Sequence, residues 1–158
     1  MLAHIGFPSA GSSLFADMGA PVTDSVHIGS LATAYIVGGR FKTIVNLSGR
    51  PYEAPPGVAK LDIFMADEDV SSDAVESYIR LFATGARFIK DNPGPYLVHC
   101  MAGVNRSATL IMWHLIDLGW TFDDAYLAIA RANATRGMPL LTNRSFVTLL
   151  KAKYQLKR

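Results

Sequence analysis

The 158-residue chain contains a single cysteine, Cys100, so it cannot form a disulfide within itself. A lone cysteine suits a reducing compartment. The sequence has no apolar run of about 18 residues, the length that a membrane span requires. Its first residues, MLAHIGFPSAGSS, lack the basic start and the long apolar core of a signal peptide. We therefore expect a cytoplasmic or nuclear protein that is neither secreted nor inserted in a membrane.

Charged residues are scarce and unevenly placed. Residues 1–124 carry eight Lys or Arg against thirteen Asp or Glu, whereas residues 125–158 carry seven basic residues and no acidic one. This basic segment is either a solvated helix face or a shoulder that attracts anionic substrates. Its aromatic residues form no interleaved stripe with the basic ones, so nucleic acid is not an expected partner. His and Asp show no metal-ligand spacing, and we expect neither a metal nor another cofactor.

Short apolar strands alternate with helices along the chain. Strands are predicted near residues 26–29, 41–47, 60–65 and 96–98, and helices near residues 31–37, 71–90, 106–118, 121–136 and from 143 onward. The helix at 71–90 is expected to bury a stripe made of Ile79, Phe82, Phe88 and Ile89. This order predicts a single α/β domain whose central, mostly parallel sheet of four or five strands has helices on both faces. Residues 22–158 form that domain, and the apolar residues 1–21 either pack on it or serve as an arm in a homodimer.

Cys100 lies in a loop between the strand that ends near residue 98 and the core helix that Arg106 opens. Such a cysteine is often only a small buried hydrophobic residue. Here, however, a loop that contains Gly103 can fold its N–H groups into an anion-binding cup at the helix N-terminus. A thiol beside a guanidinium in that cup should ionise below the ordinary pKa of about 8.5. A thiolate and a bound tetrahedral oxyanion together would suit cleavage of a phosphate ester.

The run His99-Cys100-x-x-Gly103-x-x-Arg106-Ser107 resembles the signature of the cysteine-dependent protein phosphatases. The longer run HCMAGVNRSATL is similar to the dual-specificity phosphatases of the small, atypical type. Weaker likenesses follow in the right order at residues 26–30, 41–48, 63–67 and 143–146. The resemblance implies that residues 22–158 are a catalytic domain with its phosphatase loop between a strand and a core helix.

The resemblance also implies roles for individual residues. Cys100 would be the nucleophile that forms a phosphocysteine, and Asp67 would be the general acid, with Asp69 as the alternative. Ser107 would donate a hydrogen bond to the sulfur or cap the helix, while His99 and Asn143 would support the loop, Asn143 also as a helix cap. The phosphate would bind to the arginine and the loop amides, which belong to Met101, Ala102, Gly103, Val104, Asn105 and Arg106.

The implied substrate is a phosphorylated protein carrying phosphotyrosine or phosphoserine/threonine. The loop lacks the lysines typical of phosphoinositide phosphatases, and the chain lacks the aromatic loop of the tyrosine-specific branch. The run Gly103-Val-Asn-Arg106 is also similar to RNA 5′-triphosphatases of this fold, and a module that binds phosphoproteins without cleaving them is a third interpretation. An arginine that many relatives use for a second phosphate would align near Met138. Arg136 lies nearby, and its role stays open.

Overall fold

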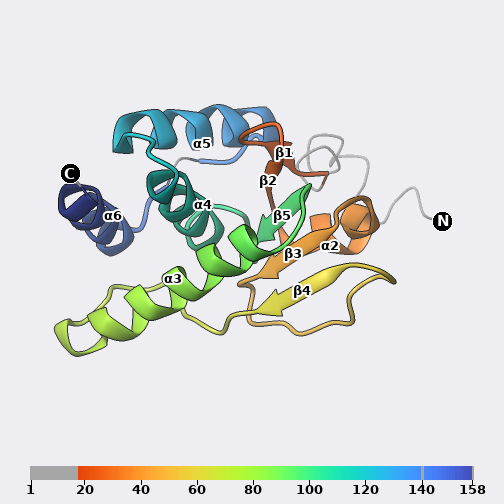
Figure 1. Ribbon diagram of the computed structural model, residues 1–158, viewed down its shortest axis with the longest axis horizontal. Coiled ribbons are helices and arrows are strands. Elements are labelled where there is room, and N and C mark those ends of the chain that lie inside the picture. Colours follow the sequence, from red (N-terminus) through yellow and green to blue (C-terminus); the bar gives the residue numbers. More distant parts are fainter. Residues whose placement is uncertain (1–17, 140, 158) are drawn as a thin grey trace.

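A five-stranded sheet forms the centre of the molecule. The computed structural model describes residues 18–139 and 141–157. The strands are β1 (Ala20–Pro21), β2 (Val26–Gly29), β3 (Thr43–Asn46), β4 (Ala59–Asp62) and β5 (Tyr96–His99). They lie in the order β1-β2-β5-β3-β4 (Figure 1). β1 pairs with β2 in antiparallel fashion and the other three pairs are parallel, which places β5 between two parallel neighbours.

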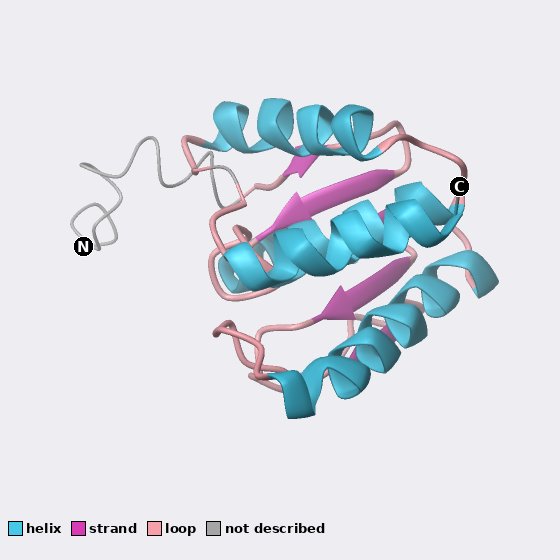
Figure 2. Cartoon of the chain, turned by 90° about the vertical axis from the view of Figure 1, so that its left-hand side faces the viewer, coloured by secondary structure: helices cyan, strands magenta, loops and turns pink. Residues whose placement is uncertain are grey.

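Helices connect the strands and cover the sheet. They are α2 (Leu31–Val37), α3 (Val75–Asp91), α4 (Arg106–Asp117), α5 (Phe122–Arg136) and α6 (Arg144–Lys157), with short 3-10 helices η2 (Gly38–Arg40) and η3 (Ser72–Ala74). Figure 2 shows long helices lying side by side across one face of the sheet. Across residues 18–139 and 141–157, no helix combines the length and apolar character needed to span a bilayer.

Neighbouring residues of the central strands point to opposite faces of the sheet, as strand geometry requires. On β3, Ile44 packs into the small cluster under α2, whereas Val45 packs into the large cluster under α3, α4, α5 and α6. On β5, Leu97 and Val98 divide in the same way. All four side chains are completely buried. The sheet is therefore covered on both faces, which explains why its strands are continuous apolar runs.

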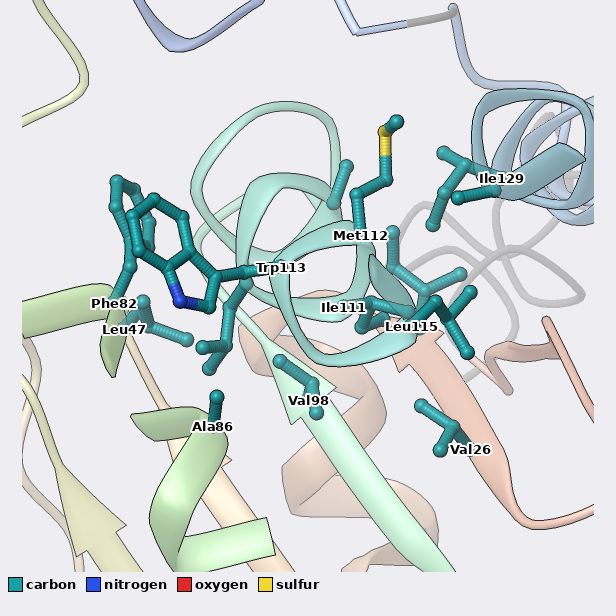
Figure 3. Packing of buried hydrophobic residues seen from close by; sticks show 14 of the residues in the cluster. Val26, Leu47, Phe82, Ala86, Val98, Ile111, Met112, Trp113, Leu115 and Ile129 are labelled. Atoms are coloured by element: carbon teal, nitrogen blue, oxygen red, sulfur yellow. The ribbon is translucent and has the colours of Figure 1, made fainter. Parts of the chain in front are cut away.

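Helix α4 passes through the centre of the core. Ten of its twelve residues, from Ser107 to Ile116, are buried. In Figure 3, α4 carries Trp113, which lies beside Phe82 of α3, and Met112, which lies on the side of Ile129 from α5. The rings of Phe82 and Trp113 stack with their centroids 5.7 Å apart. Because α4 is held on all sides, the residues at its N-terminus occupy a fixed position.

Truncation of Phe82 to alanine should destabilise the protein strongly. Phe82 has no exposed surface, and its ring also meets Phe146 edge to face at 5.5 Å between centroids. The lost burial and the cavity should lower the free energy of unfolding by about 3–5 kcal/mol, measurable by urea denaturation. The matched control is Phe64→Ala, because Phe64 is 63% exposed, and it should change stability by less than about 0.5 kcal/mol. Equal effects of the two variants would contradict this description of the core.

The predicted fold class is confirmed: the sheet is mostly parallel and helices cover both faces. The strands at Thr43–Asn46 and Ala59–Asp62 are shorter than the predicted 41–47 and 60–65. The sheet also begins earlier than the predicted domain, since Ala20 of the supposed extension pairs with Ile28. Residues 1–17 of that extension lie outside the described residues, so its role as a surface segment or a dimer arm stays a prediction.

The buried stripe of α3 differs from the prediction by part of a turn. Ile79 was expected in the core but is 37% exposed, while Tyr78 is buried in its place. The helix contacts α4 through small residues: a Cβ added at Gly85 would lie 2.8 Å from the Leu110 side chain. This close approach turns the Gly85 side of α3 inward. A pattern that counts only large apolar residues misses it.

Candidate active site

Cys100 follows the last residue of the central strand β5 and precedes α4. In the parallel ladder, His99 of β5 lies level with Gly29 of β2 and Asn46 of β3. Three carboxyl ends therefore meet at one edge of the sheet, which is where ligands bind in folds of this kind. We call residues 100–106 the cysteine loop.

The carbonyl groups of the first four loop residues all accept hydrogen bonds from the surrounding protein. The pairs are His99 Nδ1 with Cys100 O (3.3 Å), Leu31 N with Met101 O (3.2 Å), Arg136 Nη2 with Ala102 O (2.9 Å), and Arg136 Nη1 (2.9 Å) and Asn133 Nδ2 (3.1 Å) with Gly103 O. A trans peptide is planar, so each carbonyl points opposite to the N–H of the next residue. Because these carbonyls are hydrogen-bonded on one side of the loop, the N–H groups of the residues that follow them point to the opposite side of the loop.

Those N–H groups are the expected anion donors. The Gly103 N–H donates to the Cys100 sulfur at 3.3 Å. In the described part of the chain, the loop N–H groups of Met101, Ala102, Val104 and Asn105 donate to no protein acceptor. Several unpaired donors around a sulfur, directly before a helix N-terminus, form a cup with positive potential.

Gly103 and Arg136 fit each other closely. Gly103 has φ +74°, and a Cβ there would lie 2.5 Å from Arg136 Nη1 and 2.6 Å from the carbonyl oxygen of Gly29. A larger residue would displace the guanidinium that holds the loop carbonyls. Arg136 is 3% exposed and also donates to Asn133 Oδ1 at 2.9 Å. The sequence does not predict the role of Arg136. It does not predict the role of Asn133 either, because no pattern within a helix identifies a residue that contacts a distant loop.

The environment of the Cys100 thiol favours the thiolate. Burial by itself raises the pKa of Cys100, but hydrogen bonds from the Ser107 side chain and backbone, the charge of Arg106 and the Gly103 N–H act in the opposite direction and prevail, so that the pKa lies below its ordinary value. The Ser107 hydroxyl lies 3.3 Å from the sulfur. The predicted contact between Ser107 and the Cys100 sulfur is therefore present.

Replacing Ser107 with alanine should raise the pKa of Cys100, because it removes the hydroxyl that lowers it. The rate of iodoacetamide alkylation, followed from pH 4 to pH 10, should reach its midpoint at a higher pH in Ser107→Ala than in the unchanged protein. Ser72→Ala, which alters an exposed serine, serves as the control and should leave the midpoint in place. An unmoved midpoint in Ser107→Ala would show that the hydroxyl does not stabilise the thiolate.

One N–H group of the Arg106 guanidinium is hydrogen-bonded within the protein, and another has no partner among the described residues. Its Nη1 donates to the carbonyl oxygen of Met65 at 3.1 Å. Its Nε is buried and has no hydrogen-bond partner among the described residues. Leaving a buried guanidinium N–H unpaired costs free energy. An oxyanion bound in the cup would satisfy it, and the phosphate-binding role of Arg106 stays a prediction.

Asp67 is brought to the cysteine loop by two asparagines. Asn105 Nδ2 donates to Asp67 Oδ2 at 2.9 Å, and Asn143 Nδ2 donates to Asp67 Oδ1 at 2.8 Å. Asn105 Oδ1 in turn accepts the backbone N–H groups of Thr142 and Asn143 at 2.8 and 2.9 Å. Asn105 therefore joins three separate segments: the cysteine loop, the loop of Asp67 and the start of α6. Asp69, the alternative acid, is exposed, and its carboxylate has no hydrogen-bond partner in the described residues.

Asn143 caps α6 as expected, but its side chain supports the loop of Asp67, and only its backbone N–H contacts the cysteine loop, through Asn105. Its Oδ1 accepts the Phe146 N–H at 3.1 Å and so caps α6, and its Nδ2 donates to Asp67 and to the Glu68 carbonyl at 2.9 Å. One side chain thus fixes the helix and the acidic loop together.

His99 is a structural support behind the loop. Burial lowers the pKa of His99 to about 4, so the ring is neutral above about pH 5. The contact with the Cys100 carbonyl places the proton on Nδ1, and Nε2 then accepts from the Tyr52 hydroxyl at 2.7 Å. Lys60 lies over the Tyr52 ring at 4.3 Å and pairs with Asp62 at 2.7 Å. Tyr52, which the sequence did not mark, connects the edge of the sheet to the cysteine loop.

Part of the basic C-terminal segment lies away from the cysteine loop. Lys153 and Lys157 pair with Asp117 at 2.8 and 3.9 Å. Asp117 is the last residue of α4, whose twelve residues separate it from Arg106 by about 17 Å at 1.5 Å per residue. These two lysines therefore serve helix packing and not the anion cup.

Comparison with known proteins places this arrangement in a family. The model of the dual specificity phosphatase catalytic domain matches residues 30–155, which is most of the chain. The chain belongs to this family.

Individual relatives agree with the assignment. The dual specificity protein phosphatase H1 of Variola virus is 28% identical over 99 residues, which cover 61% of this chain and 57% of the viral protein; the H1 homolog of Fowlpox virus is 30% identical over 100 residues, 61% and 59% of the two chains. The matches thus span less than two thirds of these relatives. The fold is shared with human DUSP28 (TM-score 0.68, 24% identity, 87% of this chain and 93% of that one) and with the tyrosine phosphatase OH1 of Orf virus (TM-score 0.61, 24% identity, 94% and 98%).

Proposed function

We propose that this protein is a dual-specificity protein phosphatase that hydrolyses phosphotyrosine and phosphoserine/threonine through a phosphocysteine. In the first step the Cys100 thiolate attacks phosphorus, the S–P bond forms, the bond to the leaving oxygen breaks, and Asp67 gives that oxygen its proton. In the second step Asp67 takes a proton from water, the water oxygen attacks phosphorus, and the S–P bond breaks to release phosphate. Arg106 and the loop amides hold the phosphoryl oxygens, and Ser107 stabilises the departing thiolate.

One observation carries the proposal. A cysteine of lowered pKa lies among unpaired N–H groups and beside the partnerless Nε of Arg106. The nucleophile and the donors for three phosphoryl oxygens are thus fixed before reaction, and preorganised donors of this kind usually give the largest part of the rate enhancement. The proposed mechanism assigns no step to a metal or another cofactor.

The structure favours this proposal over the RNA 5′-triphosphatase. Asn105 is the loop residue that suggested the alternative, and both ends of its side chain are used within the protein, on Asp67 and on residues 142–143. Its presence therefore has an explanation that needs no RNA. A binding module without catalysis would gain nothing from a thiolate and a carboxylate held on the same cup.

Turnover of p-nitrophenyl phosphate in EDTA tests the proposal first, followed by phosphate release from phosphotyrosine, phosphoserine and phosphothreonine peptides. We expect turnover of all four substrates and a phosphorylated cysteine upon acid quenching. Faster release of γ-phosphate from triphosphate-ended RNA than from the peptides would favour the RNA triphosphatase. Peptide binding without phosphate release would favour the binding module. The phosphoprotein partner, the cytoplasmic location and the homodimer remain predictions.

A further inference from the structure

A hollow of about 410 Å³ adjoins the cysteine loop on the side of α2. Two of the residues that line it, Met101 and Ala102, directly follow the nucleophile. Its apolar lining consists of Leu31, Ala32, Tyr35, Met101, Ala102 and Met138. The hollow therefore borders the first residues of the cysteine loop, and its apolar lining differs in chemical character from the N–H groups of that loop.

The hollow offers no exposed cation. Arg136 is the one charged residue in its lining, as far as the described residues show. Arg136 is 3% exposed, and its guanidinium donates to Ala102 O, Gly103 O and Asn133 Oδ1. The Arg136 guanidinium is therefore hydrogen-bonded to the cysteine loop and to Asn133. A second phosphate placed in the hollow would contact apolar side chains.

Large apolar side chains at the rim remain exposed. Tyr35 is 63% exposed and Met101 is 42% exposed. The Tyr35 ring packs edge to face on Tyr52 at 5.6 Å between centroids. The Met101 backbone is held by the Leu31 N–H, which donates to the Met101 carbonyl at 3.2 Å. A preformed apolar surface beside a polar, anion-binding cup is the usual construction of a site that recognises one charged group and an apolar neighbour.

We propose that this hollow is a subsite for an apolar or aromatic side chain next to the phosphorylated residue of the substrate. The inference rests on the proposed function and narrows it: the preferred substrates are singly phosphorylated protein segments with an apolar flanking residue. Segments with an acidic or second phosphorylated residue at that place are disfavoured, because the hollow would have to desolvate a charge without pairing it.

Peptide kinetics with the 158-residue chain test the subsite. The peptides share one phosphotyrosine and carry Leu, Ser, Glu or phosphoserine directly before it or directly after it. On one of the two sides, the Leu peptide should exceed the Glu and phosphoserine peptides in kcat/KM by about tenfold, mainly through KM, the scale on which an apolar pocket separates substrates. Equal kcat/KM for all peptides would overturn the subsite. Turnover of p-nitrophenyl phosphate in the same preparation keeps this failure distinct from failure of the proposed function.

A charge placed in the hollow should reverse the preference. In Met138→Lys, the ratio of kcat/KM for the Leu peptide to that for the phosphoserine peptide should fall by at least about tenfold, since the lysine would pair with the second phosphate. The matched control is Leu156→Lys, which adds the same charge at a leucine that is 89% exposed on α6. Its ratio should equal that of the unchanged protein. A fall of the same size in both variants would overturn the proposal.

The other candidate occupant is the chain's own N-terminal segment, with its apolar residues Phe7 and Phe15. The double variant Phe7→Ser, Phe15→Ser of the full chain should keep the preference for the Leu peptide. If the unchanged protein showed no preference and the preference for the Leu peptide appeared only in the double variant, the hollow would be the binding place of that segment and the substrate subsite of the unchanged protein would be wrong.

Discussion

Substitution of Cys100 by serine will abolish turnover. We expect kcat for p-nitrophenyl phosphate in EDTA to fall by at least about 10⁴-fold, the scale on which enzymes respond to loss of a nucleophile. The hydrogen bonds from Ser107 and Gly103 and the charge of Arg106 lower the pKa of the Cys100 thiol and so favour the thiolate. The same contacts cannot ionise a serine hydroxyl at neutral pH.

The phosphate cup itself should survive this substitution. The loop carbonyls remain bound to Arg136 and Asn133, so Cys100→Ser should still bind phosphopeptides, measurable by calorimetry. If Cys100→Ser retained turnover, Cys100 would not be the nucleophile. A sulfur that iodoacetamide does not reach at neutral pH would contradict it as well, since a closed or protonated thiol cannot attack phosphorus.

Asp67→Ala will have the second-largest effect, and the effect will depend on the leaving group. An alkoxide leaves poorly without a proton, so turnover of a phosphoserine peptide should fall by about 10²–10⁴-fold, the range of a positioned general acid. p-Nitrophenolate is a stable anion and leaves without help, so turnover of p-nitrophenyl phosphate should fall much less. The measurement is kcat for both substrates in the same variant.

Asp69→Ala is the matched control, because Asp69 is in the same loop and lacks the two asparagine contacts of Asp67. It should leave kcat for both substrates close to that of the unchanged protein. If Asp69→Ala were the crippled variant, the assignment of the acid would be wrong. If Asp67→Ala lost both substrates equally, Asp67 would hold the site together and would not act as an acid.

Much of the fold could be predicted because the chain's local signals agree with its tertiary structure. The helix at Leu31–Val37 ends before two glycines, and the strand at Val26–Gly29 was found with its observed bounds. The buried face of α3 was predicted incorrectly because Gly85, which has no side chain, allows α3 to lie close to Leu110. A hydropathy pattern does not identify such a small residue as part of a packed face. The two-residue strand β1 was missed because nothing so short has a periodicity.

The candidate site was predicted where its residues lie close together in the sequence. The spacing of Cys100, Arg106 and Ser107 placed the sulfur beside its expected partners. The supports of the loop come from elsewhere: Tyr52 through His99, and Asn133 and Arg136 through the loop carbonyls. Their side chains reach the loop only because the core brings distant elements together. No local sequence pattern predicts contacts between residues so far apart in the chain.

The presence of one sulfhydryl in the chain has a consequence for oxidative stress. Peroxide reacts with thiolates, so a lowered pKa makes Cys100 a target that would first become a sulfenic acid. Within this chain no second cysteine exists to trap that species as a disulfide. Recovery would therefore depend on an external thiol such as glutathione, or on ring closure with a backbone nitrogen. Reactivation after a mild peroxide pulse should accordingly follow the concentration of added reductant.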